Sequence, residues 1–337
     1  MITLQKQYQL LLKSIELLPQ QIIAGRQLKI KTSLIAKIKT ADNVIVCGMG
    51  GSALGFDLVR HALGSYLKKP VIINSHYHLP AFANQRSLII LASYSGSTAE
   101  TINCAREANK KKFNTITVCG QAKSALAKIP TTQLLLFTGQ YNPSQQPRWG
   151  IGYFIGFFIQ LLTDLEWSLW PTNKITTDFI NESVISDPKN KQNLVHRQLL
   201  IIAGEHLIGN AHILNNQINE TAKNISYWLT LPELNHHFLE GLVKPRGLVK
   251  EKLAVIFLES SLYSPAIKKR LLLTKQIFHK NGAKVISLQT LAKNIWLDSL
   301  STLHLGAILC YDMARWNNVD PMKIPQVDYF KQRLSHH

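Results

Sequence analysis

The chain has 337 residues, of which 46% are hydrophobic and 17% charged, and 38 Lys and Arg against 20 Asp and Glu give a net charge of +18. This length and apolar content suit two α/β domains and exclude an intrinsically disordered chain. No segment has the roughly eighteen uninterrupted apolar residues of a membrane-spanning helix.

The basic residues are scattered, as at 110–112 and 268–270, and do not form one stripe. We therefore expect a general positive field that attracts anionic small molecules, and no nucleic-acid partner. The four cysteines lack the paired spacing of a disulfide framework or a zinc site, which suits a reducing compartment. Polar residues interrupt every apolar run near the N-terminus, so we expect a cytoplasmic protein with no signal segment and no membrane partner.

Residues 1–38 have apolar side chains at helical spacing, broken at Pro19. This pattern predicts a helical leader that packs on the lobe after it. From residue 43, short apolar runs alternate with helical patterns, which is typical of a doubly wound parallel sheet. Strands are expected at 43–47, 70–74, 87–93, 114–119 and 133–137, and helices at 53–66, 98–112, 122–128 and 148–166.

The second half of the chain repeats the first. Residues 200–204 correspond to 44–48 and residues 253–261 to 88–95, an offset of about 160 residues that indicates internal duplication. The expected fold class is α/β, with two doubly wound parallel-sheet lobes. The expected parts are a helical leader (1–38), a first lobe with phosphate-binding loops (39–166), a linker (167–189), and a second lobe with a C-terminal helix and tail (190–337).

Two loops of small residues follow the first and third expected strands. They read Gly48-Met49-Gly50-Gly51-Ser52 and Ser93-Tyr94-Ser95-Gly96-Ser97-Thr98. Carboxyl ends of parallel strands meet at one edge of a sheet, where open α/β sheets bind ligands. Backbone N–H groups and hydroxyls without a lysine suit a small phosphate ester. The phosphate-binding candidates are Gly50, Gly51, Ser52, Ser93, Ser95 and Thr98. The alternative is that Ser95 and Thr98 only cap a helix.

These paired loops resemble the signatures of sugar isomerase (SIS) domains. Three later segments narrow the resemblance: Pro147-Arg148 before a helix, Asn219-Glu220-Thr221-Ala222-Lys223-Asn224, and Pro232-Glu233-Leu234-Asn235-His236. In this order they are similar to the bifunctional phosphoglucose/phosphomannose isomerase family of archaea and bacteria. The resemblance implies an aldose–ketose isomerase that interconverts glucose 6-phosphate and mannose 6-phosphate with fructose 6-phosphate through a cis-enediol.

The resemblance also implies roles for four residues. Glu220 would move a proton between C1 and C2, Arg148 would stabilise the enediolate, and His236 with Lys331 would open the sugar ring. In the family this histidine reaches the site from the neighbouring subunit, so a homodimer is expected. A carboxylate and a cation suffice for this proton transfer, so no metal and no other cofactor is expected.

The chain departs from the family after the histidine, where Asn-His-Asn-Glu is usual and this sequence reads Asn235-His236-His237-Phe238. The departure favours one alternative, a non-catalytic sugar-phosphate sensor built on the same lobes. A nucleic-acid binder that uses the +18 charge is a second alternative. A different SIS enzyme, such as a glucosamine phosphate isomerase lobe, would need an ammonia-handling domain that the sequence does not show.

Overall fold

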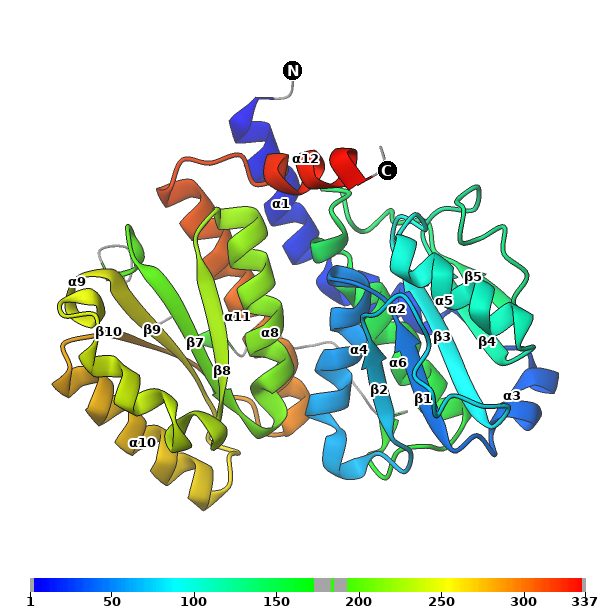
Figure 1. Ribbon diagram of the computed structural model, residues 1–337, viewed down its shortest axis with the longest axis horizontal. Coiled ribbons are helices and arrows are strands. Elements are labelled where there is room, and N and C mark those ends of the chain that lie inside the picture. The colour runs from blue at the N-terminus through cyan, green and yellow to red at the C-terminus, as the bar shows by residue number, and fades with distance from the viewer. Residues whose placement is uncertain (1–2, 173–182, 185–192, 335–337) are drawn as a thin grey trace.

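The computed structural model describes residues 3–172, 183–184 and 193–334, which form two α/β lobes side by side (Figure 1). Each lobe is built on one five-stranded sheet. The expected fold class of two duplicated α/β lobes is confirmed, with one antiparallel strand added to the second sheet.

The first sheet is parallel throughout and has the order β2-β1-β3-β4-β5. Its strands are β1 Asn43–Cys47, β2 Val71–Asn74, β3 Ser87–Ser93, β4 Asn114–Cys119 and β5 Gln133–Leu136. They agree with the expected strands to within one residue at each end. The central ones are short apolar runs buried on both faces, the pattern that parallel sheets require.

Helices cover both faces of the first sheet. They are α4 Gly51–Ala62 and α6 Ile151–Asp164 on one face and α5 Ala99–Lys110 on the other. The alternation of side chains along β1 sends Val44 into the core beneath α4 and α6, and Ile45 into the core beneath α5. The carboxyl ends of β1 and β3, which are neighbours, are therefore free to hold the loops that lead into α4 and α5.

The second sheet has the order β6-β10-β9-β7-β8. Its strands are β6 Ser183–Val184, β7 Gln198–Gly204, β8 Ser226–Leu231, β9 Leu253–Glu259 and β10 Lys284–Thr290. The run β8-β7-β9-β10 repeats the order β2-β1-β3-β4 of the first sheet, as duplication predicts. The fifth place is taken by antiparallel β6, which comes from the segment expected to be only a linker. That expectation is corrected at residues 183–184, whereas residues 173–182 and 185–189 lie outside the described residues.

The helical elements of the second lobe place it against the first. They are η5 Glu205–Leu207, α8 Ile208–Gln217, η6 Ile218–Ala222, η7 Glu233–His236, η8 Phe238–Val243, α9 Leu248–Lys252, α10 Pro265–Lys280, α11 Ile295–Trp316 and α12 Pro325–Leu334. Helix α8 lies directly on α4, where a Cβ at Gly209 would stand 2.6 Å from the Cα of Leu58. His212 Nδ1 lies 2.9 Å from Asp57 Oδ2 across the same contact. The lobes are thus joined by close packing and by a polar pair.

The N-terminal leader is three helices, α1 Leu4–Glu16, α2 Leu18–Arg26 and α3 Thr32–Ile38. Pro19 ends the first run but fits the first turn of α2, where its missing N–H is not needed. The expectation that the leader packs on the first lobe is incomplete for α1, which contacts both lobes: its Ser14 hydroxyl accepts from the Ser144 N–H of the first lobe at 2.9 Å. The Tyr8 hydroxyl donates to the Val319 carbonyl at 2.9 Å, and Leu11 belongs to the core of the second lobe.

The helix expected at 122–128 is also wrong, because this segment forms turns. The Leu126 N–H donates to the Gly96 carbonyl at 2.9 Å, and the Ala127 N–H bonds to the Ser124 hydroxyl at 3.3 Å. A seven-residue segment gains little from helix formation alone. Contacts with the second loop therefore decide its conformation.

Candidate active site

The two expected phosphate loops lie side by side at the carboxyl edge of the first sheet. The Ser52 hydroxyl accepts a hydrogen bond from the Tyr94 N–H at 2.9 Å and so ties one loop to the other. Gly50 has a φ of +50°, which favours glycine. A Cβ at Gly51 would lie 2.8 Å from the backbone nitrogen of Arg148 and closer still to the Pro147 carbonyl oxygen. The first loop therefore touches the segment that carries Arg148.

The hydroxyls of the second loop divide into two groups. Buried Ser93 accepts a hydrogen bond from the Gly96 N–H at 3.0 Å, and its Oγ lies 2.9 Å from Thr98 Oγ1. Ser95 and Ser97 are exposed, with hydroxyls 2.9 Å apart. Ser93 and Thr98 thus shape the loop, whereas the other pair faces solvent. Ser97 was missed from the sequence, although it stands inside the quoted motif.

Arg148 is 2% exposed and lies in the 3-10 helix η2 Pro147–Trp149, just before α6. Each of the five N–H groups of its guanidinium has an acceptor. The acceptors are Thr221 Oγ1 at 2.9 Å, Gln146 Oε1 at 2.9 Å, Glu220 Oε2 at 3.2 Å, and the carbonyls of Pro321 at 2.7 Å and Met322 at 3.2 Å. Burial lowers the pKa of Arg148, and Glu220 beside it opposes that shift. The residue joins three segments that are distant in the sequence.

Glu220 lies in η6, a π-helical turn that continues α8, and its side chain is 33% exposed. Such turns often mark functional sites. Lys223 ends the turn in the left-handed conformation, with φ of 55°, and its Nζ donates to the Glu220 carbonyl. Burial lowers the pKa of Lys223, and the charge of Arg148 lowers it further. Among the expected site residues, Glu220, Arg148 and the first loop therefore come together.

His236 lies elsewhere in the same chain. Glu220 precedes β8 and His236 follows it in η7, and the six residues of β8 between them span roughly 20 Å. His236 is exposed. The neighbouring Asn235 is held in place, since its Nδ2 donates to Thr274 Oγ1 at 2.8 Å and its Oδ1 accepts from Arg270 at 3.3 Å. The turn presents His236 to solvent away from Glu220.

The departure after His236 has a structural explanation. Phe238 packs against the core of the second lobe, where its ring centroid lies 6.5 Å from that of Phe278, while His237 stays exposed. The apolar residue therefore anchors the turn that carries His236. Lys331 is exposed on α12, a helix that buries none of its residues, and it makes no described contact with the loops.

At the carboxyl edge of the second sheet, acidic side chains stand where the first lobe has its two loops. Glu205 Oε2 accepts a hydrogen bond from the Ser264 N–H at 3.0 Å, and Glu259 Oε1 lies 2.5 Å from Lys275 Nζ. A carboxylate at each loop opposes a phosphate. This supports the expectation that only the first lobe carries phosphate-binding loops.

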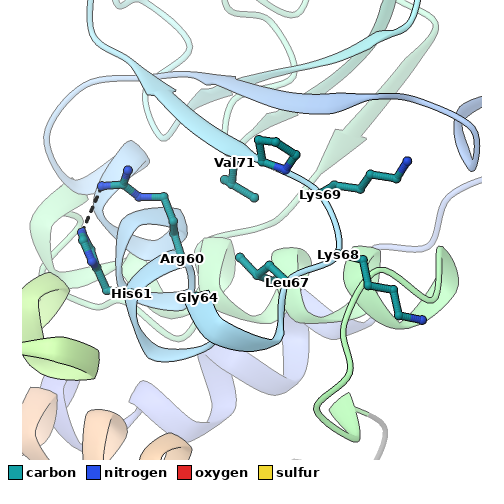
Figure 2. Close-up of a pocket in the computed structure, with 8 residues that line it drawn as sticks. Arg60, His61, Gly64, Leu67, Lys68, Lys69 and Val71 are labelled. Carbon is teal, nitrogen blue, oxygen red and sulfur yellow. Dashed lines mark hydrogen bonds between the residues drawn. The ribbon is translucent and has the colours of Figure 1, made fainter.

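A hollow of about 500 Å³ lies away from these loops, between the end of α4 and the start of β2. Figure 2 shows that Lys68 and Lys69 point away from Arg60. The Arg60 guanidinium already bonds to Asp57 and to His61 Nε2, at 2.6 Å and 3.0 Å. The cations of this hollow do not converge on one point, so the candidate site remains at the two loops.

Within residues 3–172, 183–184 and 193–334, no three His, Cys, Asp or Glu side chains gather as a metal site would require. None of the helices described there is long and apolar enough to cross a membrane.

Two family models match the chain. One is described as an SIS domain and matches residues 37–148, and the other is described as a bacterial phospho-glucose isomerase C-terminal SIS domain and matches residues 189–334. Among solved structures, the C-terminal domain of glucosamine-fructose-6-phosphate aminotransferase from Francisella tularensis has a TM-score of 0.69. It is 12% identical, with 94% of this chain and 97% of that chain covered, and it is similar in fold alone.

The chain is also similar to curated bifunctional phosphoglucose/phosphomannose isomerases. The protein of Caldicellulosiruptor bescii is 26% identical, with 96% of this chain and 98% of that protein covered. The protein of Thermoplasma acidophilum is 26% identical, with 88% and 91% covered. The matches span both lobes and the Arg148–Glu220 contact between them. The chain is therefore similar over most of its length to bifunctional phosphoglucose/phosphomannose isomerases, and both of its lobes match models of SIS domains.

Proposed function

We propose that the protein is a metal-independent aldose–ketose isomerase that interconverts glucose 6-phosphate and mannose 6-phosphate with fructose 6-phosphate. One observation carries the proposal: the Glu220 carboxylate lies 3.2 Å from buried Arg148, and Arg148 adjoins the first of two hydroxyl-rich loops. The candidates for the anchor, the base and the cation are thus neighbours, and this supports the proposal because enediol chemistry needs all three.

In the forward direction, the Glu220 carboxylate takes a proton from C1 of open-chain fructose 6-phosphate. The electron pair of the broken C–H bond forms the C1–C2 double bond of a cis-enediolate. The proton of the C1 hydroxyl passes to the C2 oxygen, which leaves the negative charge on O1. Glu220 then returns its proton to C2: the C1–C2 double-bond pair forms the new C–H bond, and an electron pair of O1 forms the C1 carbonyl of the aldose. The face of C2 that receives the proton decides between glucose and mannose phosphate. A partly exposed carboxylate suits both steps, because it must reach two neighbouring carbons in turn.

The remaining candidates have supporting roles. Gly50, Gly51, Ser52, Ser93, Ser95 and Thr98 form the phosphate-binding loops, in which exposed Ser95 offers its hydroxyl while Ser93 and Thr98 hold the second loop in shape. Arg148 stabilises the enediolate chiefly by its charge, since all five of its N–H groups have acceptors in the protein. His236 and Lys331 open the sugar ring before proton transfer.

We also propose that the protein is a homodimer and that each site receives His236 from the other copy. The exposed His236 follows β8, whereas Glu220 of the same chain precedes this strand, which spans roughly 20 Å. A second copy can bring it to the site without any change of fold. The four described cysteines are free and buried, which suits a cytoplasmic protein.

The testing experiment follows fructose 6-phosphate by NMR with purified protein in EDTA. We expect both glucose 6-phosphate and mannose 6-phosphate to form, at a rate that EDTA leaves within twofold. Formation of one product alone would restrict the specificity. Phosphosugar binding without turnover would contradict the proposal, and loss of turnover in EDTA that Mg²⁺ or Zn²⁺ restores would contradict metal independence.

A further inference from the structure

Gln21 of α2 has no exposed surface and makes four hydrogen bonds around its amide. Its Nε2 donates to the carbonyls of Ser14 at 3.1 Å, Tyr141 at 2.9 Å and Trp149 at 2.9 Å, so one N–H is shared. Its Oε1 accepts from the Gly152 N–H at 3.3 Å. One side chain thus holds both ends of residues 141–152, the segment that carries Arg148.

A chain of hydrogen bonds leads from this segment's start to the guanidinium. Asn142 Nδ2 donates to the Gln146 carbonyl at 2.9 Å, and the Ser144 hydroxyl donates to Asn142 Oδ1 at 2.6 Å. The Gln146 side chain then accepts from Arg148 Nη1 at 2.9 Å. From outside the segment, the Ser14 hydroxyl accepts from the Ser144 N–H at 2.9 Å. These groups are buried or partly buried, so an unmade bond is costly.

The packing of α2 on α6 leaves little freedom for this arrangement. A Cβ at Gly152 would lie 2.6 Å from the Cβ of Gln21, and a Cβ at Gly156 would lie 2.9 Å from the Arg26 nitrogen. The two helices therefore cross in near backbone contact, and the start of α6 cannot shift without moving Gln21. Since Arg148 directly precedes α6, its backbone is fixed by the same contact.

We propose that Gln21 is a positioning residue that sets the geometry of Arg148 and, through it, of Glu220. This inference rests on the proposed function. Residues 1–36, which contain Gln21 and Ser14, lie outside both family models. A segment that looks like an N-terminal addition to the two lobes thus forms part of the support of the active site.

The test compares Gln21→Met, which keeps the length but removes every polar atom, with Gln133→Met. Gln133 is a matched control, because its buried amide also bonds the N-terminal segment, at Lys29 O at 3.1 Å and the Lys31 N–H at 3.0 Å, but not the Arg148 segment. For each variant we would measure Tm, kcat and KM for fructose 6-phosphate, inhibition by inorganic phosphate, and hydrogen exchange of residues 141–152.

We expect Gln21→Met to lower kcat at least about tenfold, because small displacements of catalytic groups are costly. KM and phosphate inhibition should stay within twofold, and exchange of 141–152 should accelerate. Gln133→Met should keep kcat within twofold. If Gln21→Met does not fold, Ser14→Ala tests the same segment and should lower kcat about threefold.

Two results would overturn the inference: a folded Gln21→Met protein with kcat within twofold of the parent, or an equal loss of kcat in Gln133→Met. If the parent protein shows no isomerisation, the proposed function fails by itself. Hydrogen exchange then still decides the inference, since unchanged exchange of 141–152 in Gln21→Met would contradict it.

Discussion

In the proposed mechanism Glu220 carries the proton between two carbons, and its carboxylate is partly exposed beside the buried Arg148 guanidinium. Glu220→Gln keeps the length and an acceptor for Arg148 but cannot take up a proton at working pH. We expect kcat for fructose 6-phosphate to fall about 10²–10⁴-fold, the usual contribution of a general base. KM should change little, and NMR of the sugar phosphates measures both.

Glu166→Gln is the control, since this exposed carboxylate pairs with Lys39 on the surface of the first lobe. It should leave kcat within twofold. Turnover by Glu220→Gln within tenfold of the parent would mean that another group moves the proton.

At this scale, short motifs predicted Glu220 and Arg148, which the structure brings into contact, but not the groups that hold them in place. Glu220 and Arg148 were found because the segments around them resemble a family. The acceptors that hold Arg148, such as Thr221 and the Pro321 carbonyl, come from distant parts of the chain and follow no spacing. Lys223 lies inside one of the recognised motifs, but its bond to the Glu220 carbonyl depends on a left-handed backbone conformation. A lysine in the sequence does not predict that conformation.

At the scale of elements, the proposed site depends on the contact between the first loop and η2. Gly51→Ala would place a methyl group against the Pro147 carbonyl and 2.8 Å from the backbone nitrogen of Arg148. Because backbone on both sides must move, we expect a loss of about 1–3 kcal/mol in the free energy of unfolding. Displacement of Arg148 should also lower kcat at least about tenfold. Thermal unfolding and NMR turnover measure the two effects.

Gly64→Ala is the matched control, because a Cβ there meets nothing within 4 Å. It should keep both Tm and kcat. A Gly51→Ala protein with unchanged kcat would show that the close approach of the loop to Arg148 is not needed for turnover.

Helices and strands were predictable from the sequence where the local residue pattern favours the same structure as the tertiary contacts. The strands of the first sheet are apolar runs that only a buried parallel sheet accommodates, so their bounds followed from residue type. The segment at 122–128 has a helical pattern but bonds to Gly96 instead. Antiparallel β6 has two residues, Ser183–Val184, which is too short a run to leave a pattern.

The arrangement of the whole molecule separates the two ends of β8. Glu220 contacts Arg148 across the lobes and precedes β8, whereas His236 follows this strand, which spans roughly 20 Å. Figure 1 shows α1 and α12 at one end of the molecule, above the junction of the lobes. No local pattern reveals that Glu220 and His236 are apart, because this follows from the extended strand β8 that runs between them beside β7.

If two copies complete each other's sites, an inactive pair of variants should restore activity on mixing. Co-expressed Glu220→Gln and His236→Ala chains would form mixed dimers, half of the total, each with one intact site. We therefore expect about a quarter of the parent kcat per chain, as a symmetric pair of sites requires.

Glu220→Gln mixed with Arg148→Lys is the control, because both changes belong to the same half of the site and neither mixed site is intact. It should show no gain over the separate proteins. The pair of Glu220→Gln and His236→Ala chains could also show no gain in activity although sedimentation shows dimers. His236 would then act within its own chain or have no catalytic role. A monomeric parent protein with full turnover would contradict the shared site directly.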